Sequence, residues 1–124
     1  MIRRSCLIAG WLALAFIAFA TLAPIQDRPM VANLHLEHFA AFAAMGLAFA
    51  VGSPRRPIVI AATMVASAVV LESLQLLTAD RHGRIVDAFV KATGGVCGVG
   101  IGQVIASWLS RIEIRLALPA KSRH

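Results

Sequence analysis

The chain has 124 residues, which is enough for one domain. Hydrophobic residues make up 59% of it and charged residues 15%, whereas soluble globular domains average roughly 45–50% and about 25%. The net charge is +6, but the lysines and arginines are scattered between apolar runs and form no basic face, so the charge does not indicate nucleic-acid binding. The composition therefore predicts an integral membrane protein with no nucleic-acid partner.

Four apolar stretches are each close to the ~20 residues that a helix needs to cross a bilayer. In chain order they cover about residues 7–23, 34–51, 58–78 and 85–108, and a charged tail follows at 110–124. The predicted fold is all-α: a bundle of four transmembrane helices with short loops, in a single membrane domain spanning 1–124.

The first apolar stretch has two interpretations. Arg3 and Arg4 precede it, and Ala18-Phe19-Ala20 has the small-x-small form of a signal-peptidase site. Cleavage before Thr21 would remove this stretch as a signal peptide. Because the apolar run continues past that point, we expect a retained membrane span, and the cleaved form stays the alternative.

The next two stretches carry clear boundary signals. Asn33 is a suitable N-cap for a second helix, and His35 and His38 fall in its first two turns. Pro57 follows a tight turn and suits the first position of a third helix. The two helices are therefore expected to begin at about residues 34 and 58.

The distribution of lysine and arginine predicts the orientation. Eight of these residues lie near one side of the bundle and three near the other; the eight are Arg3, Arg4, Arg55, Arg56, Arg111, Arg115, Lys121 and Arg123, and the three are Arg28, Arg81 and Arg84. The side with eight is expected to be cytoplasmic. We predict a multi-pass protein of the cell (inner) membrane with both termini inside, the 79–84 hairpin outside, and the tail forming a short helix on anionic inner-leaflet lipid.

Ionisable and polar residues within the spans are expected to share one depth. Glu72 and Lys91 each lie seven residues from the 79–84 turn, which corresponds to ~10 Å along a helix. Gln75 and Asp87 lie about one turn below the surface, and His38 falls between the two layers. A polar residue at membrane depth is a candidate functional residue, so these side chains define a predicted polar cluster.

The short turn also places the third and fourth spans antiparallel and side by side. Glu72 can then face Lys91, and Gln75 can face Asp87. Glycines repeat every four residues along the fourth span, at Gly94, Gly98 and Gly102. This is the small-xxx-small pattern of close helix packing in lipid, and it explains how backbones come close here.

These residues resemble the signature of the VanZ-like family of small polytopic membrane proteins. The match runs Glu72-x-x-Gln75, Arg81, Asp87, then Gly94 and Gly98, with His38-Phe39-x-x-Phe42 and Gly46 upstream, and it covers about residues 34–102. The chain departs from the family pattern in two places: Lys91 replaces a usual Asn, and Leu34-His35 replaces a frequent Asp-Lys. Founding members are associated with teicoplanin resistance, and most relatives have no defined activity.

Four functions remain open from the sequence, and the least favoured is a transporter or channel, because the four spans show no inverted repeat. The first is an outward-facing site for an anionic envelope lipid or a lipid-linked cell-wall precursor headgroup, with Arg81 and Arg84 on phosphate. The second is a structural interhelical lock in a membrane scaffold protein, in which Lys91 neutralises Glu72. The third is a membrane-embedded enzyme with His38 or Glu72 as general base. A His/Glu/Asp trio could also bind a metal, but no nucleophile motif and no close ligand pair such as HExxH supports either chemistry, so neither a metal nor a cofactor is expected.

Overall fold

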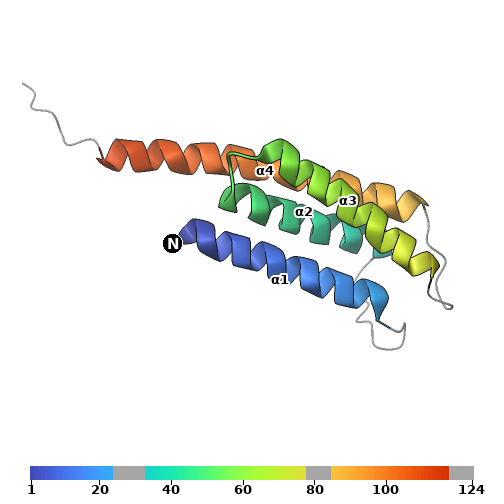
Figure 1. Ribbon diagram of the computed structural model, residues 1–124. Coiled ribbons are helices and arrows are strands. Elements are labelled where there is room, and N and C mark those ends of the chain that lie inside the picture. The colour runs from blue at the N-terminus through green and yellow to red at the C-terminus, as the bar shows by residue number, and fades with distance from the viewer. Residues whose placement is uncertain (24–32, 78–84, 118–124) are drawn as a thin grey trace, which may run out of the picture.

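The computed structural model describes residues 1–23, 33–77 and 85–117, and these form an all-α structure of four helices. The helices are α1 (Ile2–Leu22), α2 (Leu34–Gly52), α3 (Pro57–Leu76) and α4 (Ile85–Ala117). Each is long and apolar enough to cross a membrane. The predicted four-helix membrane fold is confirmed (Figure 1).

The helix boundaries follow from local sequence. Ala23 has extended backbone angles, as the residue before Pro24 should, and α1 ends there. Asn33 caps α2, because its side-chain oxygen accepts a hydrogen bond of 3.2 Å from the His35 backbone N–H. Pro57 occupies the first position of α3. The predicted starts of the second and third helices are thus confirmed to within one residue.

Successive helices run in opposite directions, and α2 lies between α1 and α4 (Figure 1). The contact between α2 and α4 is the most extensive, and α3 packs mainly on α4. Because the helices alternate in direction, their ends form two groups at opposite ends of the bundle. We call the group formed by residues 21–23, 33–38, 72–77 and 85–91 the polar end, and the group formed by 1–4, 52–57 and 106–117 the arginine end.

The glycine stripe of α4 packs against α2. A Cβ atom at Gly98 would overlap the carbonyl of Ala43, and one at Gly94 would overlap the carbonyl of Phe39. A Cβ at Gly102 would lie 2.6 Å from that of Ala50. The stripe was predicted to bring backbones close, and it does so, but its partner is the second helix and not the adjacent third helix.

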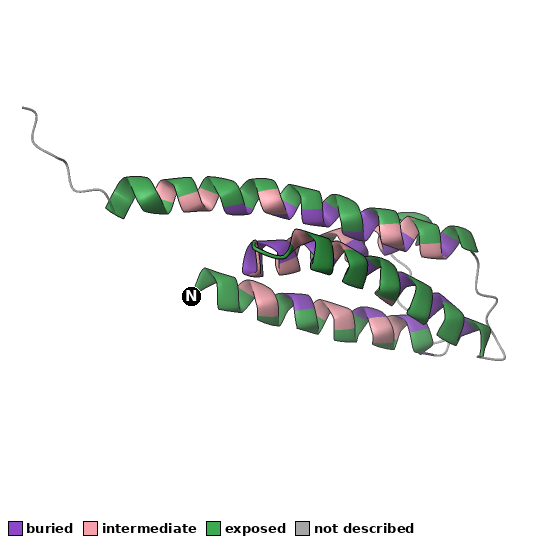
Figure 2. Ribbon diagram, turned by 45° about the horizontal axis from the view of Figure 1, so that its top comes forward, coloured by how far each residue is buried: buried purple, intermediate pink, exposed green. Residues whose placement is uncertain are grey.

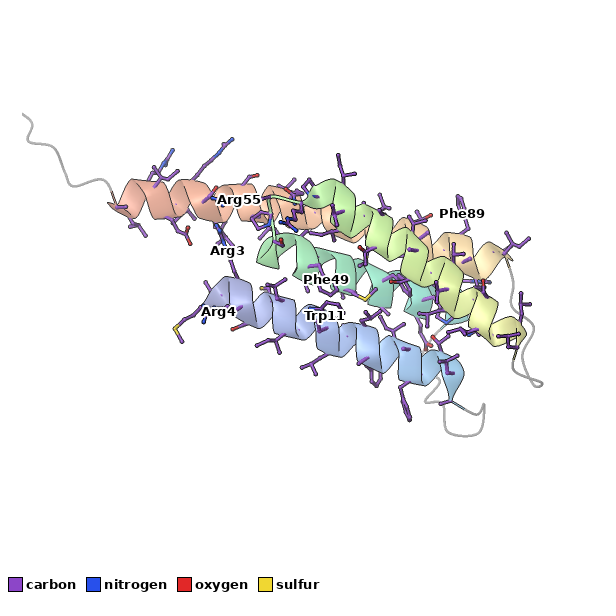
Figure 3. The ribbon with its side chains drawn as sticks, in the orientation of Figure 1. Arg3, Arg4, Trp11, Phe49, Arg55 and Phe89 are labelled. Atoms are coloured by element: carbon purple, nitrogen blue, oxygen red, sulfur yellow. The ribbon has the colours of Figure 1, made fainter. Side chains whose placement is uncertain are left out.

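Buried residues lie on the faces where the helices meet, and exposed residues cover the outside of the bundle (Figure 2). Phe42 and Met45 of α2 and Met64 of α3 are fully buried in the core. Trp11 of α1 meets the ring of Phe49 edge-on, with 5.4 Å between ring centroids (Figure 3). The outward apolar surface is what a helix bundle presents to lipid.

Helix α4 continues past the predicted end of the fourth span at 108 and runs unbroken to Ala117. No Gly or Pro interrupts this part of the helix, and Ser107 and Ser110 donate hydrogen bonds back to the carbonyls of Gln103 and Ser107. Residues 110–117 of the predicted tail are therefore an extension of the transmembrane helix and not a separate surface helix. Residues 118–124 lie outside the described residues.

Candidate functional site

The polar end contains a buried ion pair between α3 and α4. Lys91 Nζ donates a hydrogen bond of 2.7 Å to Glu72 Oε2. The Lys91 side chain is 0% exposed and that of Glu72 is 8% exposed. The predicted approach of these two residues is confirmed, and the pair is sealed from both water and lipid.

A second acid–base contact lies within the same polar end, about one helical turn nearer the start of α4. His35 Nδ1 on α2 lies 3.0 Å from Asp87 Oδ1 on α4. The His35 side chain is 46% exposed, whereas that of Asp87 is 9% exposed. The contact is an ion pair when the imidazole is protonated, and it connects the buried carboxylate to the surface.

The Asp87 carboxylate keeps an open acceptor. Its Oδ1 atom is buried, and apart from the ion-pair contact with His35 at 3.0 Å it receives no hydrogen bond from the described residues. A buried carboxylate oxygen in this state is costly unless something else donates to it. Asp87 is therefore the described group at this end that is best prepared to receive a ligand.

Gln75 connects α3 to α1. Its Nε2 donates a hydrogen bond of 3.3 Å to the backbone carbonyl of Thr21, in the last turn of α1. The expectation that Gln75 faces Asp87 is wrong, since Asp87 meets His35 instead. The reason is that α1 ends at the same level and exposes carbonyls that have no helical partner.

His38 is buried on α2, as a member of the predicted cluster should be. It lies one turn from His35 and one turn from Phe42, so it faces the interior of the bundle, deeper than His35. Arg81 and Arg84 belong to the connection between α3 and α4 and lie outside the described residues. The structure thus brings together Glu72 with Lys91 and leaves the two arginines as sequence predictions.

Sequence reasoning missed His35 as a partner of Asp87. The signal was present, because His35 and His38 are i,i+3 neighbours in the first turns of α2. It was not decisive, since residue depth alone does not tell which of two histidines faces the fourth helix.

The arrangement limits the chemistry of this end. Glu72 already accepts a hydrogen bond from Lys91, so it is poorly suited to act as a general base. Within the described ranges, no group of three His, Cys, Asp or Glu side chains is placed to hold a metal ion. What the site offers is an accessible imidazole next to a buried carboxylate.

No protein-family model matches this chain, and no curated protein and no solved structure matches it either. The resemblance to VanZ-like proteins stays a prediction. The four apolar helices themselves identify the chain as a multi-pass helical membrane protein.

Proposed function

We propose that this chain is a VanZ-like membrane protein whose polar end recognises the headgroup of an anionic envelope lipid or lipid-linked cell-wall precursor. In this proposal the polar cluster has two parts. Glu72 and Lys91 form a closed floor, and recognition takes place above them at a rim formed by His35 and Asp87 together with Arg81 and Arg84.

The observation that carries the proposal is the open acceptor on Asp87. Its Oδ1 is buried beside a half-exposed His35 and receives no hydrogen bond from the described residues. Sugar hydroxyl and amide N–H groups are the donors that such a carboxylate binds. Lipid-linked cell-wall precursors carry both kinds of donor next to phosphate.

The phosphate of the same ligand would bind the basic residues of the rim. Arg81 and Arg84 precede Asp87 by six and three residues in the connection between α3 and α4. Guanidinium groups bind phosphate oxygens in a bidentate manner, and a protonated His35 adds a third donor. This combination favours a headgroup that has both negative charge and neutral hydrogen-bond donors.

The proposal requires the polar end to face out of the cytoplasm, as the distribution of arginines favours. Both native cysteines are unpaired and would first be replaced by serine. A cysteine at His82 should then react with a membrane-impermeant maleimide in intact cells, and one at Arg55 should not. The reverse pattern would put the polar end in the cytosol and would contradict the proposal.

Binding is tested with Asp87→Ala and Arg81→Ala in the purified full chain. Each should weaken retention of a lipid-linked precursor by about tenfold or more, because hydrogen bonds to charged groups contribute ~1.5–3 kcal/mol. Quantitative mass spectrometry of co-purified lipid measures the effect. Arg28→Ala is the matched control, because it removes the same charge from the other segment connected to this end.

A second function, an interhelical lock in a membrane scaffold, is favoured by the sealed Glu72–Lys91 bond. A lock needs no ligand. If Asp87→Ala and Arg81→Ala both retained as much lipid as the control variant, the headgroup proposal would be abandoned and the lock alone would remain.

A further inference from the structure

A small cleft lies at the arginine end, where the first turn of α1 approaches α2 and the extension of α4. Its volume is about 30 Å³, and it is lined by Ile2, Arg3, Val51, Ala106, Leu109 and Glu113. Four of these six residues are apolar. The volume has room for only about two water molecules, so only the surface above the cleft can receive a headgroup.

The position of α1 beside the cleft is fixed by close packing. A Cβ atom at Gly52, the last residue of α2, would lie 2.7 Å from Leu7 Cγ and 3.1 Å from the carbonyl oxygen of Arg3. The absence of a side chain at Gly52 therefore allows the backbone of Arg3 to rest against the end of α2. This packing of α1 on the end of α2 fixes the position of the cleft's rim.

Two opposite charges stand at this rim. Arg3 points from α1 toward α4 (Figure 3), and its Nη2 lies 4.0 Å from Glu113 Oε2. The side chains are 52% and 70% exposed. A pair this long and this exposed contributes little by itself, so both groups keep hydrogen-bonding capacity for a third molecule.

The other basic residues of α4 do not contribute to this rim. Arg111 and Arg115 each stand two residues from Glu113, and residues at i,i+2 do not share a helix face. The residues that line the cleft therefore include one positive and one negative group, Arg3 and Glu113, beside four apolar ones. The two opposite charges of the lining match the two charges of a zwitterionic headgroup.

We infer that this rim binds the phosphoethanolamine headgroup of a membrane phospholipid. Arg3 contacts the phosphate, and Glu113 accepts hydrogen bonds from the primary ammonium. Ile2 and Leu109 contact the glycerol end of the acyl chains. Phosphatidylcholine lacks the N–H donors for Glu113, and phosphatidylglycerol lacks the ammonium, so the site distinguishes phosphatidylethanolamine from both.

Native mass spectrometry of the full chain, in micelles containing one dioleoyl phospholipid at a time, tests this inference. The wild-type protein should retain phosphatidylethanolamine over phosphatidylcholine and phosphatidylglycerol by about two- to fivefold, the range expected for one exposed ion pair. Glu113→Gln should make retention of phosphatidylethanolamine equal to that of phosphatidylcholine. Arg3→Gln should lower retention of all three lipids.

Arg4→Gln is the matched control, since Arg4 is an exposed neighbour with the same charge and is not part of the cleft. It should behave as wild type. Circular dichroism should show full helicity in every variant, because the substituted side chains are exposed. A wild-type preference for phosphatidylglycerol, a preference for phosphatidylethanolamine that survives Glu113→Gln, or equal losses from Arg3→Gln and Arg4→Gln would each overturn the inference.

Discussion

Helix α4 makes two extensive contacts, and the feature that stands out differs between them. It meets α3 through a buried ion pair between Lys91 and Glu72, and it meets α2 through a stripe of glycines that includes Gly94 and Gly98. The first contact depends on groups that must be present. The second depends on side-chain atoms that must be absent.

The difference matters because lipid gives helices no hydrophobic reason to associate. Interhelical hydrogen bonds in membranes contribute only ~0.6 kcal/mol on average, so the ion pair is a weak source of net stability. Glycine contacts bring backbones together and gain dispersion energy over a longer surface. We therefore attribute most of the bundle's cohesion to the α2–α4 contact, and the register of α3 on α4 to the ion pair.

Removing one member of the ion pair should have the largest effect. Lys91→Met removes the ammonium that donates to the buried Glu72 carboxylate, and loss of one member of a buried ion pair costs about 3–5 kcal/mol. The free energy of unfolding, measured by SDS titration in mixed micelles with circular dichroism, should fall by that amount.

The double variant Glu72→Leu/Lys91→Met separates two free energies: the cost of removing one charge of the pair, and the net stabilisation that the intact pair provides. Replacement of both partners by apolar residues is often neutral or stabilising, so the double variant should recover most of the stability that Lys91→Met loses. If it is as unstable as Lys91→Met, the pair is a major source of cohesion, and our contrast between the two contacts is wrong.

A side chain in the glycine stripe should have the next largest effect. Gly98→Leu forces atoms into the carbonyl of Ala43, and overpacking of this kind costs about 1–3 kcal/mol. Gly100→Leu is the matched control, because a Cβ there would meet no atom within 4 Å. The control should change stability by no more than about 0.5 kcal/mol. Equal losses in the same unfolding assay would show that glycine is needed for some reason other than space.

Much of the fold could be predicted because its signals are local. Span length and apolar content define four helices, and Asn33 and Pro57 determine where two of them begin. The partner of the glycine stripe could not be predicted, because Gly94 and Gly98 show only that some backbone comes close. The third helix, adjacent in sequence, was assumed to pack on the glycine stripe of α4, whereas α2 packs there.

The depth of the site residues along their helices could be predicted, but the direction in which each side chain points could not. Counting residues from the turn brought Glu72 to the level of Lys91, because helical rise converts sequence distance into depth. Counting does not give the rotation of each helix about its axis. Gln75 was consequently expected to meet Asp87, although it reaches the carbonyl of Thr21 on a helix that sequence reasoning had left outside the cluster.

The smallest expected effect concerns this link between α3 and α1. Gln75→Leu keeps the side-chain volume but removes the donor to the Thr21 carbonyl, and it should cost only ~0.6 kcal/mol, the average for a hydrogen bond between membrane helices. Ser73→Ala is a control at similar depth, because Ser73 bonds within its own helix to Val69, and it should not weaken any contact between helices. A loss for Gln75→Leu as large as that for Lys91→Met would mean that α1 is held by polar contacts as firmly as α3. In that case the ion pair could no longer be regarded as the specific determinant of one interface, and the polar end would be a single cooperative network.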